Sequence, residues 1–414
     1  MRFNRFMIYI FAALVLVGMA SCSSEDSGWQ EDEVEKTIVM FYPWSTTLLG
    51  EFKANVSDFS SVIASRGLHG ERVVVCMATA PDDAVVYELK SAKGRCVADT
   101  LRRYHNRTFT SRQSMASLFA DLKEIAPARK YAMIVGCHGM AWVHTDEIGQ
   151  PQRIMRHYDV ASPLHTRYMG GLSADCQIET QDFASALKDA GLKMEYILFD
   201  NCYMSSVEVA YEMKDVAEYI IASPTEIMSS GFPYRRCGEY LLGNADCVKV
   251  AEEFIAFYSQ SKTPYATIAV TDCSEMDNLA AIVMRINQAS ADVSVAASDL
   301  QRMDGYSPTL FYDFGHYISK KCSDPELLDA FSRQLDKTII YKGNTEYYYS
   351  ALAGPVRIDH FSGMNTSAPS TNRLAQGYEE TEWGKRVAHP TNPVEAVQML
   401  TQKLVAKRYM IAKK

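Results

Sequence analysis

A histidine and a cysteine each stand at the end of an apolar run, and together they could form a catalytic pair. His138 follows the run 131–136, and Cys202 follows the run 195–199. The carboxyl ends of parallel strands open into one crevice, so residues distant in sequence can meet there. An imidazole beside a thiol supplies a nucleophile with its acid and base. A hydrogen-bonded histidine and a buried structural thiol are the alternative.

The residues around this pair suit the same chemistry. We expect a helix to start at Ser205, so that its free N–H groups lower the pKa of the Cys202 thiol. Backbone N–H groups of Gly139 and Cys202 are natural donors to an oxyanion, and a glycine lets a substrate carbonyl approach closely. The chain has no CxxC pair, so the sequence does not favour structural zinc.

Asp200 lies two residues before Cys202, and strand alternation places both side chains on the same side. A carboxylate there can bind a cationic substrate side chain, Arg through two hydrogen bonds or Lys as a point charge. It would then select the residue before the scissile bond. The alternative is that Asp200 or Asn201 caps the following helix.

The start of the chain has the organisation of an export signal. Residues 1–21 combine a basic start, an apolar stretch too short to span a bilayer comfortably, and small residues before Cys22. This segment resembles the lipobox of bacterial lipoproteins, which implies that Cys22 is lipidated. Ordinary secretion with cleavage near Ala20 is the alternative. Residues 22–34 are polar and acidic, as expected of a flexible tether.

Charge and composition limit the classes of partner that the protein can bind. The 414 residues carry a formal net charge of −8 and no long basic block, which argues against nucleic acid. The acidic tether resembles surface-export signals of some Gram-negative lipoproteins. We therefore expect an exported protein, lipid-anchored to the cell envelope at the outer membrane and facing outward, whose partners are proteins or peptides.

Strand-like and helix-like runs alternate along the chain. The expected strands are 37–42, 71–77, 131–136, 195–199 and 218–223, and the expected helices are 48–64, 111–125, 180–189 and 205–214. Such alternation implies an α/β fold with a mostly parallel sheet flanked by helices. The pattern is less regular later, so we predict a catalytic domain over 35–240 and a C-terminal α+β region over 241–414 packed on it.

Ten cysteines occur, without a regular disulfide framework. Most are expected to be structural, and Cys76 lies in a strand-like run where cysteine behaves as a small apolar residue. Cys237 and Cys247 could pair across a short loop. A thiol at Cys137, beside His138, could oxidise against Cys202 and silence it.

Several segments resemble one known family. Residues 200–213 closely resemble the segment around the catalytic cysteine of the clostripain family of cysteine peptidases, and residues 137–142 resemble its His-Gly segment. Residues 222–234 and 37–49 are similar to two further blocks of the family. The similarity is good over 35–240 and continues weakly to about residue 390. Cys137, Met140 and Ala141 depart from the polar or smaller residues that are common there.

This resemblance implies a caspase-like sandwich, shared with gingipains, legumain and caspases, with His138 and Cys202 as the dyad and no metal or other cofactor in the chemistry. It implies cleavage after Arg or Lys, with Asp200 as the selector. It also implies activation by self-cleavage between the two segments, in some members with calcium. The loop 143–176 carries three candidate sites, which could equally be ordinary loop residues: Arg153, Arg156 and Arg167.

We therefore predict a cysteine endopeptidase that acts through a thioester acyl-enzyme. The Cys202 thiolate attacks a peptide carbonyl, and His138 protonates the leaving amine before water releases the product. The alternative is a catalytically silent, lipid-anchored binding or adhesion protein on the same scaffold. The presence of both His138 and Cys202 favours the enzyme, because a silent scaffold has no chemical need for the pair.

Overall fold

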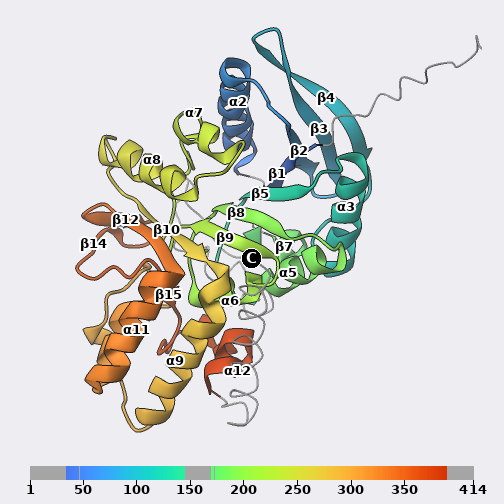
Figure 1. Ribbon diagram of the computed structural model, residues 1–414. Coiled ribbons are helices and arrows are strands. Elements are labelled where there is room, and N and C mark those ends of the chain that lie inside the picture. Colours follow the sequence, from blue (N-terminus) through green and yellow to red (C-terminus); the bar gives the residue numbers. More distant parts are fainter. Residues whose placement is uncertain (1–33, 46, 145–168, 172, 389–414) are drawn as a thin grey trace, which may run out of the picture. The chain divides into compact units, whose positions relative to one another are not determined.

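The computed structural model describes residues 34–45, 47–144, 169–171 and 173–388 (Figure 1). The largest feature of the described chain is a nine-stranded sheet in the order β12-β10-β9-β8-β5-β1-β2-β3-β4. Its strands are β1 (Lys36–Tyr42), β2 (Glu71–Ala80), β3 (Asp83–Ala92), β4 (Arg95–Tyr104), β5 (Lys130–Gly136), β8 (Met194–Asp200), β9 (Ala217–Ala222), β10 (Thr267–Asp272) and β12 (Ile339–Asn344).

The middle of the sheet is parallel. Strands β2, β1, β5, β8 and β9 pair in parallel, whereas β3 and β4 extend the sheet antiparallel on one side and β10 and β12 on the other. The central strands are buried almost from end to end, as in β5, where only Lys130 is exposed. Strands covered on both faces are expected to have such continuous apolar runs. The predicted α/β fold with a mostly parallel central sheet is confirmed.

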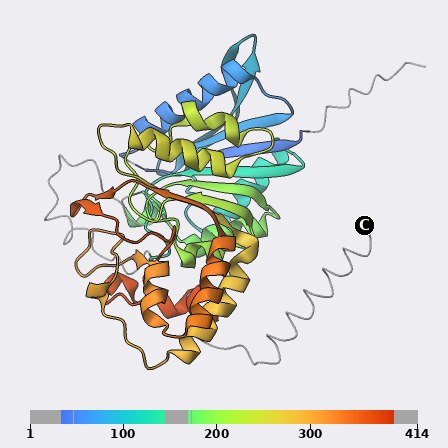
Figure 2. The same cartoon turned by 60° about the vertical axis from the view of Figure 1, so that its left-hand side comes forward.

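Helices cover both faces of the sheet (Figures 1 and 2). The alternation of β1 illustrates the two layers, because Phe41 contacts Phe119 and Phe183 while the next residue, Tyr42, stacks on Phe52. Phe119 and Phe183 belong to α3 (Arg112–Ile125) and α5 (Thr180–Asp189), and Phe52 belongs to α2 (Leu49–Arg66). The helices concerned are α2 (Leu49–Arg66), α7 (Tyr234–Cys237) and α8 (Cys247–Ser259) in one layer and α3 (Arg112–Ile125), α5 (Thr180–Asp189) and α6 (Val207–Met213) in the other.

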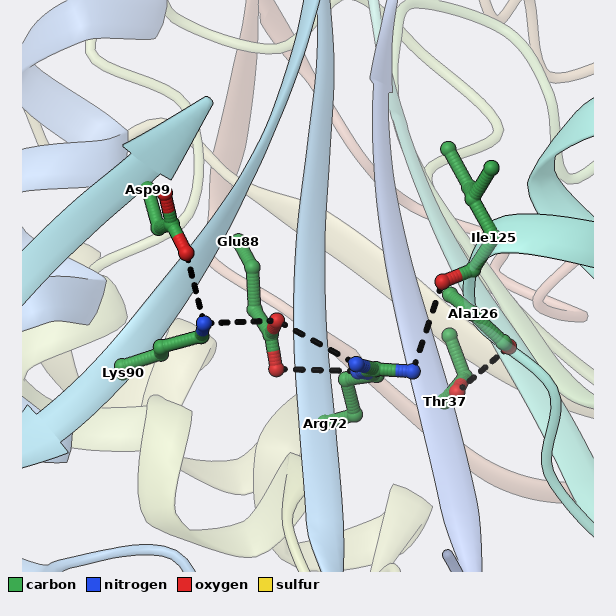
Figure 3. A network of polar contacts seen from close by, with 7 residues as sticks. All are labelled: Thr37, Arg72, Glu88, Lys90, Asp99, Ile125 and Ala126. Atoms are coloured by element: carbon green, nitrogen blue, oxygen red, sulfur yellow. Dashed lines mark hydrogen bonds and ion pairs between the residues drawn. The ribbon is translucent and has the colours of Figure 1, made fainter. Parts of the chain in front are cut away.

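The hairpin of β3 and β4 is an element that the sequence pattern did not predict. Most of β4 is exposed or half-buried, so it lacks the apolar run of a central strand. Glu88 and Asp99 face each other across the two strands, and Lys90 lies between them at 3.6 Å and 2.6 Å (Figure 3). Arg72 of β2 donates to Glu88 at 2.9 Å. Arg72 and Lys90 offset the like-charge repulsion between the two carboxylates, and the exposed pair of Lys90 with Asp99 stabilises the fold only weakly.

Residues after 240 contribute two strands to the same sheet and an additional group of helices. The contacts gather Val34–Lys414 into one compact unit, so the boundary at residue 240 stays a prediction. The added helices are α9 (Met276–Ala289), α10 (Phe314–Lys321), α11 (Pro325–Thr338) and α12 (Glu382–Ala388). Short paired strands complete the fold: β6 (Met169–Gly170) with β7 (Gln177–Ile178), β11 (Tyr312–Asp313) with β15 (Asn365–Thr366), and β13 (Tyr347–Ser350) with β14 (Gly354–Arg357).

The nine described cysteines are all free thiols. The predicted pairing of Cys237 with Cys247 is therefore wrong. Cys76 is buried in β2, and burial raises its pKa to about 12, which agrees with a purely packing role. Among the described helices, none combines the length and apolar character needed to cross a bilayer.

Candidate active site

The ends of two neighbouring strands bring the predicted pair to one edge of the sheet. Strands β5 and β8 run parallel, with Gly136 opposite Asp200. His138 and Cys202 each follow two residues later, on the same edge. The Asn201 side-chain amide joins the two ends, because its Nδ2 donates to the His138 carbonyl at 3.2 Å and contacts the Cys137 Sγ at 2.7 Å.

His138 is buried, and its main chain and its ring are both held. Its backbone N–H and C=O bond with Gly170 at 3.2 Å and 3.1 Å. Its Nε2 lies 3.0 Å from the Oγ1 of Thr47, in the loop between β1 and α2. The hydroxyl can donate or accept depending on the tautomer of the imidazole, and in either role it orients the ring. Sequence reasoning missed Thr47, whose only signal is its position just after a strand that ends at this edge.

The Cys202 thiol has a backbone donor aimed at it. The N–H of Ile227 lies 3.3 Å from the Cys202 Sγ, and the cysteine is only 5% exposed. A hydrogen bond of this kind favours the thiolate. The predicted contribution from a helix N-terminus is wrong, because α6 starts only at Val207, with Ser206 as its N-cap residue. For the same reason, neither Asp200 nor Asn201 caps that helix.

The residue after the cysteine has a left-handed backbone conformation. Tyr203 has φ +65, which lies in a backbone region that residues other than glycine rarely adopt. Its N–H donates to the Thr225 carbonyl at 3.0 Å, and its hydroxyl donates to Glu226 at 2.8 Å. Strain of this type persists only where surrounding contacts enforce it. The turn therefore directs the chain away from Cys202 immediately after the thiol.

Gly139 lies against the backbone of Cys202. A Cβ at this position would come within 2.4 Å of the Cys202 carbonyl oxygen, so only glycine fits. Gly139 is a buried residue, and within the described part of the chain its N–H has no hydrogen-bond acceptor. Buried backbone donors are rarely left unpaired. The free N–H is therefore available to a substrate oxygen.

Asp200 lies in a polar corner beside these strand ends. Its Oδ2 accepts from the Tyr234 hydroxyl at 2.9 Å, the Phe232 N–H at 3.3 Å and the Asn55 amide at 3.4 Å. Its Oδ1 has no partner among the described residues. Burial raises the pKa of Asp200 to about 6, although the bonds from Phe232 and Tyr234 oppose this shift. The carboxylate thus keeps one oxygen for a ligand.

Two residues that sequence reasoning missed shape this corner. A Cβ at Gly231 would come within 2.6 Å of the Asp200 carboxylate, and its φ of +66 also favours glycine. The Tyr42 hydroxyl is buried without a hydrogen-bond partner among the described residues. Burial, and then the charge of Asp200, raise the pKa of Tyr42 well above its ordinary value. A second unpaired polar group therefore lies near the carboxylate.

Cys137 does not behave as a partner for Cys202. Its thiol contacts the Asn201 amide, and burial raises its pKa to about 12. A thiol with so high a pKa forms little of the thiolate that oxidation requires. The predicted oxidation of Cys137 against Cys202 therefore finds no support in this geometry.

Some predicted residues cannot be placed. The lipidation site Cys22 and the three loop arginines, Arg153, Arg156 and Arg167, lie outside the described residues, as do the export signal and most of the tether. Over the described ranges, no group of three or more His, Cys, Asp or Glu side chains could hold a metal ion. The prediction that calcium activates the protein stays untested.

Comparisons with known proteins bear on the family and the fold of the chain. The sequence model of the clostripain family matches residues 55–391. The secreted C11 cysteine protease "iotapain" of Bacteroides thetaiotaomicron is 42% identical, with a TM-score of 0.79, over 86% of this chain and 99% of that one. A clostripain from B. thetaiotaomicron ATCC 29148, in complex with the peptide inhibitor BTN-VLTK-AOMK, is 49% identical, with a TM-score of 0.52, over 53% of this chain and 99% of that one.

A third solved structure extends the comparison. An inactive zymogen C11 protease from Parabacteroides distasonis is 26% identical, with a TM-score of 0.71, over 85% of this chain and 97% of that one. No curated protein matches significantly. The similarity to solved structures therefore spans the α/β sheet and the residues that follow it.

Proposed function

The chain belongs to the clostripain family of cysteine peptidases, and from this premise we propose that Cys202 and His138 carry its chemistry. The thiolate of Cys202 attacks a peptide carbonyl and forms a tetrahedral oxyanion. His138 gives its proton to the leaving amine, and a thioester remains. His138 then takes a proton from water, which attacks the thioester and releases the acid. The Ile227 N–H beside the Cys202 Sγ supports this role, since it stabilises the thiolate.

The unpaired N–H of Gly139 is the observation that carries the proposal. It lies next to the Cys202 backbone, it is buried, and it has no acceptor in the described structure. When the Cys202 thiolate attacks the substrate carbonyl, the carbonyl oxygen becomes an oxyanion, and this oxyanion would be the missing acceptor. Donors that are already in place before the reaction account for about 10²–10³-fold in rate in acyl transfer.

We assign substrate selection to Asp200. A cationic side chain before the scissile bond would pair with its free Oδ1, and the unpaired Tyr42 hydroxyl adds a second polar contact. One free oxygen suits the point charge of Lys better than the two-point geometry of Arg. The relative that was solved with the inhibitor BTN-VLTK-AOMK bound a peptide whose last residue is written K, for lysine.

Self-cleavage in the loop 143–176 is part of the proposal. Gly170, near the end of that loop, is bonded to the His138 backbone. The described end of this loop therefore lies beside the proposed catalytic histidine. The relative that is 42% identical is described as secreted, which supports export of this chain as well. Lipid anchoring at Cys22, the outer-membrane location and activation by calcium remain proposals.

A panel of fluorogenic peptides that differ only before the scissile bond tests the function. We expect wild-type residues 28–414 to cleave after Lys, more slowly after Arg, and about 10²-fold more slowly after neutral residues, because only cations pair with Asp200. Failure to cleave any peptide, even after limited tryptic nicking and addition of calcium, would favour the silent binding scaffold instead.

The pH dependence of cleavage should report the ionisation of Asp200. We expect kcat/KM for a Lys peptide to rise as the pH passes about 6, because burial raises the pKa of Asp200 to about 6 and only the ionised form attracts the ammonium. A bound ammonium lowers the pKa of Asp200. The corresponding rise in kcat should therefore occur at a lower pH than the rise in kcat/KM. Alkylation of Cys202 by iodoacetamide is the control, since it does not involve Asp200. If the Asp200→Asn variant keeps the rise in kcat/KM near pH 6, the rise does not report Asp200.

A further inference from the structure

A segment of the C-terminal region is hydrogen-bonded to the chain that follows Cys202. The N–H of Asn365 donates to the Ser205 carbonyl at 2.9 Å, and the Ser205 hydroxyl donates to the Gly363 carbonyl at 2.7 Å. The Asn365 side chain donates to the Pro224 carbonyl at 2.7 Å. Residues 363–367, which include β15, are therefore bonded to the chain just after Cys202 and to the neighbouring segment at Pro224.

A buried carboxylate fastens this segment to the helix after Cys202. Glu208 of α6 is only 2% exposed. Its Oε1 accepts from the Thr366 hydroxyl at 2.7 Å and the Ser367 N–H at 3.1 Å, and Ser206 donates to its other oxygen. Burial raises the pKa of Glu208 against the effect of these bonds. A carboxylate is costly to bury unless such donors surround it, so its presence here requires a reason.

The same segment also contacts the loop that carries His138. The indole Nε1 of Trp142 donates to the Ser367 hydroxyl at 2.8 Å, and both side chains are buried. That hydroxyl lies 3.5 Å from the Glu208 Oε1. The loop is fixed in addition by Thr180, whose hydroxyl donates to the Ala141 carbonyl at 2.8 Å, where Ala141 has φ +53. Trp142, Ser367 and Glu208 thus form a continuous polar connection.

We propose that this connection, Trp142–Ser367–Glu208, is a brace that fixes the loop of His138 relative to α6, the helix that follows Cys202, and so holds the two catalytic residues in place. Ser367 and Glu208 are positioning residues, since neither acts on the substrate. The inference rests on the proposed pair of His138 and Cys202. The brace also explains the buried charge, because a carboxylate accepts several strong hydrogen bonds at once where an apolar side chain would leave the donors of residues 366 and 367 unpaired.

A double-mutant cycle tests the brace. We expect Trp142→Phe and Ser367→Ala each to lower kcat by about 10–100-fold with KM within about two-fold, because small displacements of reacting groups slow the chemistry. The double variant should be no slower than the slower single variant, because both remove the same connection. Losses that multiply would overturn the proposal. Thr338→Val is the control, since it removes a buried hydroxyl of α11 whose partners in the described structure are the backbone and side chain of Gln334 in the same helix.

Two further measurements separate positioning from simple stability. Glu208→Gln keeps an acceptor for Thr366 and Ser367 and should retain kcat within about ten-fold, whereas Glu208→Leu should lose at least as much as Ser367→Ala. The rate of Cys202 alkylation is followed in all variants, and it needs no peptide. If wild type cleaves no peptide, the proposed function fails, and coupled alkylation rates still decide whether the brace exists. Lowered melting temperatures with unchanged kcat and alkylation would reduce the brace to a structural role.

Discussion

Cys202→Ala is expected to lower kcat for Lys peptides by at least about 10⁴-fold, since loss of a nucleophile removes the covalent route entirely. The fold should persist, because alanine keeps the backbone at this position and the substitution removes a single sulfur atom, whose contacts include the backbone of Ile227. Thermal unfolding and circular dichroism check the fold, and the peptide assay checks turnover.

The matched control is Cys76→Ala, which removes another buried thiol. Cys76 lies in β2, and burial raises its pKa to about 12, so it has no part in the proposed chemistry. This variant should lose stability through the small cavity it leaves while it still cleaves. Turnover by the Cys202 variant at a rate near wild type would mean that the nucleophile is a different residue.

The same variant tests self-cleavage. Purified Cys202→Ala should remain a single chain, whereas wild type should acquire new amino termini within 143–176, after Arg153, Arg156 or Arg167. Mass spectrometry of the intact proteins distinguishes these outcomes. Identical cutting of both proteins would point to a contaminating protease instead of the Cys202 thiol.

Asp200→Asn is expected to reduce kcat/KM for Lys peptides by about 10²–10³-fold, because it removes the charge that pairs with the ammonium in a desolvated corner. Cleavage after neutral residues should change little, so the preference for cations disappears. Alkylation of Cys202 should proceed at the wild-type rate. Asp189→Asn is the control, since Asp189 is a solvent-exposed carboxylate that pairs with Arg112. A retained preference for Lys would exclude Asp200 as the selector.

As the pH rises through about 6, the stability of the fold should fall while the activity rises. The folded-state pKa of Asp200 is raised to about 6, above its value in an unfolded chain. The stability that this group contributes is therefore present in acid and is lost as the pH rises through about 6. Above that pH the ionised carboxylate destabilises the fold, so Asp200→Asn should unfold at the same or a higher temperature than wild type at pH 8. Such opposition is common where a site stores an unfavourable charge for function.

Local patterns were sufficient to predict the central strands and most helices. The expected helices 48–64, 111–125 and 180–189 correspond to α2, α3 and α5, because each has an apolar face with a 3.6-residue period. The hairpin of β3 and β4 was missed, since its exposed strands have no apolar run. The start of α6 was also misplaced, because the bonds of Ser205 and Ser206 to residues 363–365 decide where the helix begins.

The sequence alone determined the chemical types and their approximate place. A histidine and a cysteine after two buried runs must emerge at the same edge of a parallel sheet, because parallel strands share their carboxyl ends. Local periodicity cannot indicate which distant groups surround them. The contacts of Thr47 with His138, Ile227 with Cys202 and Gly231 with Asp200 join segments far apart in the chain. Only tertiary packing brings such groups together, because their contacts leave no periodic pattern in the sequence.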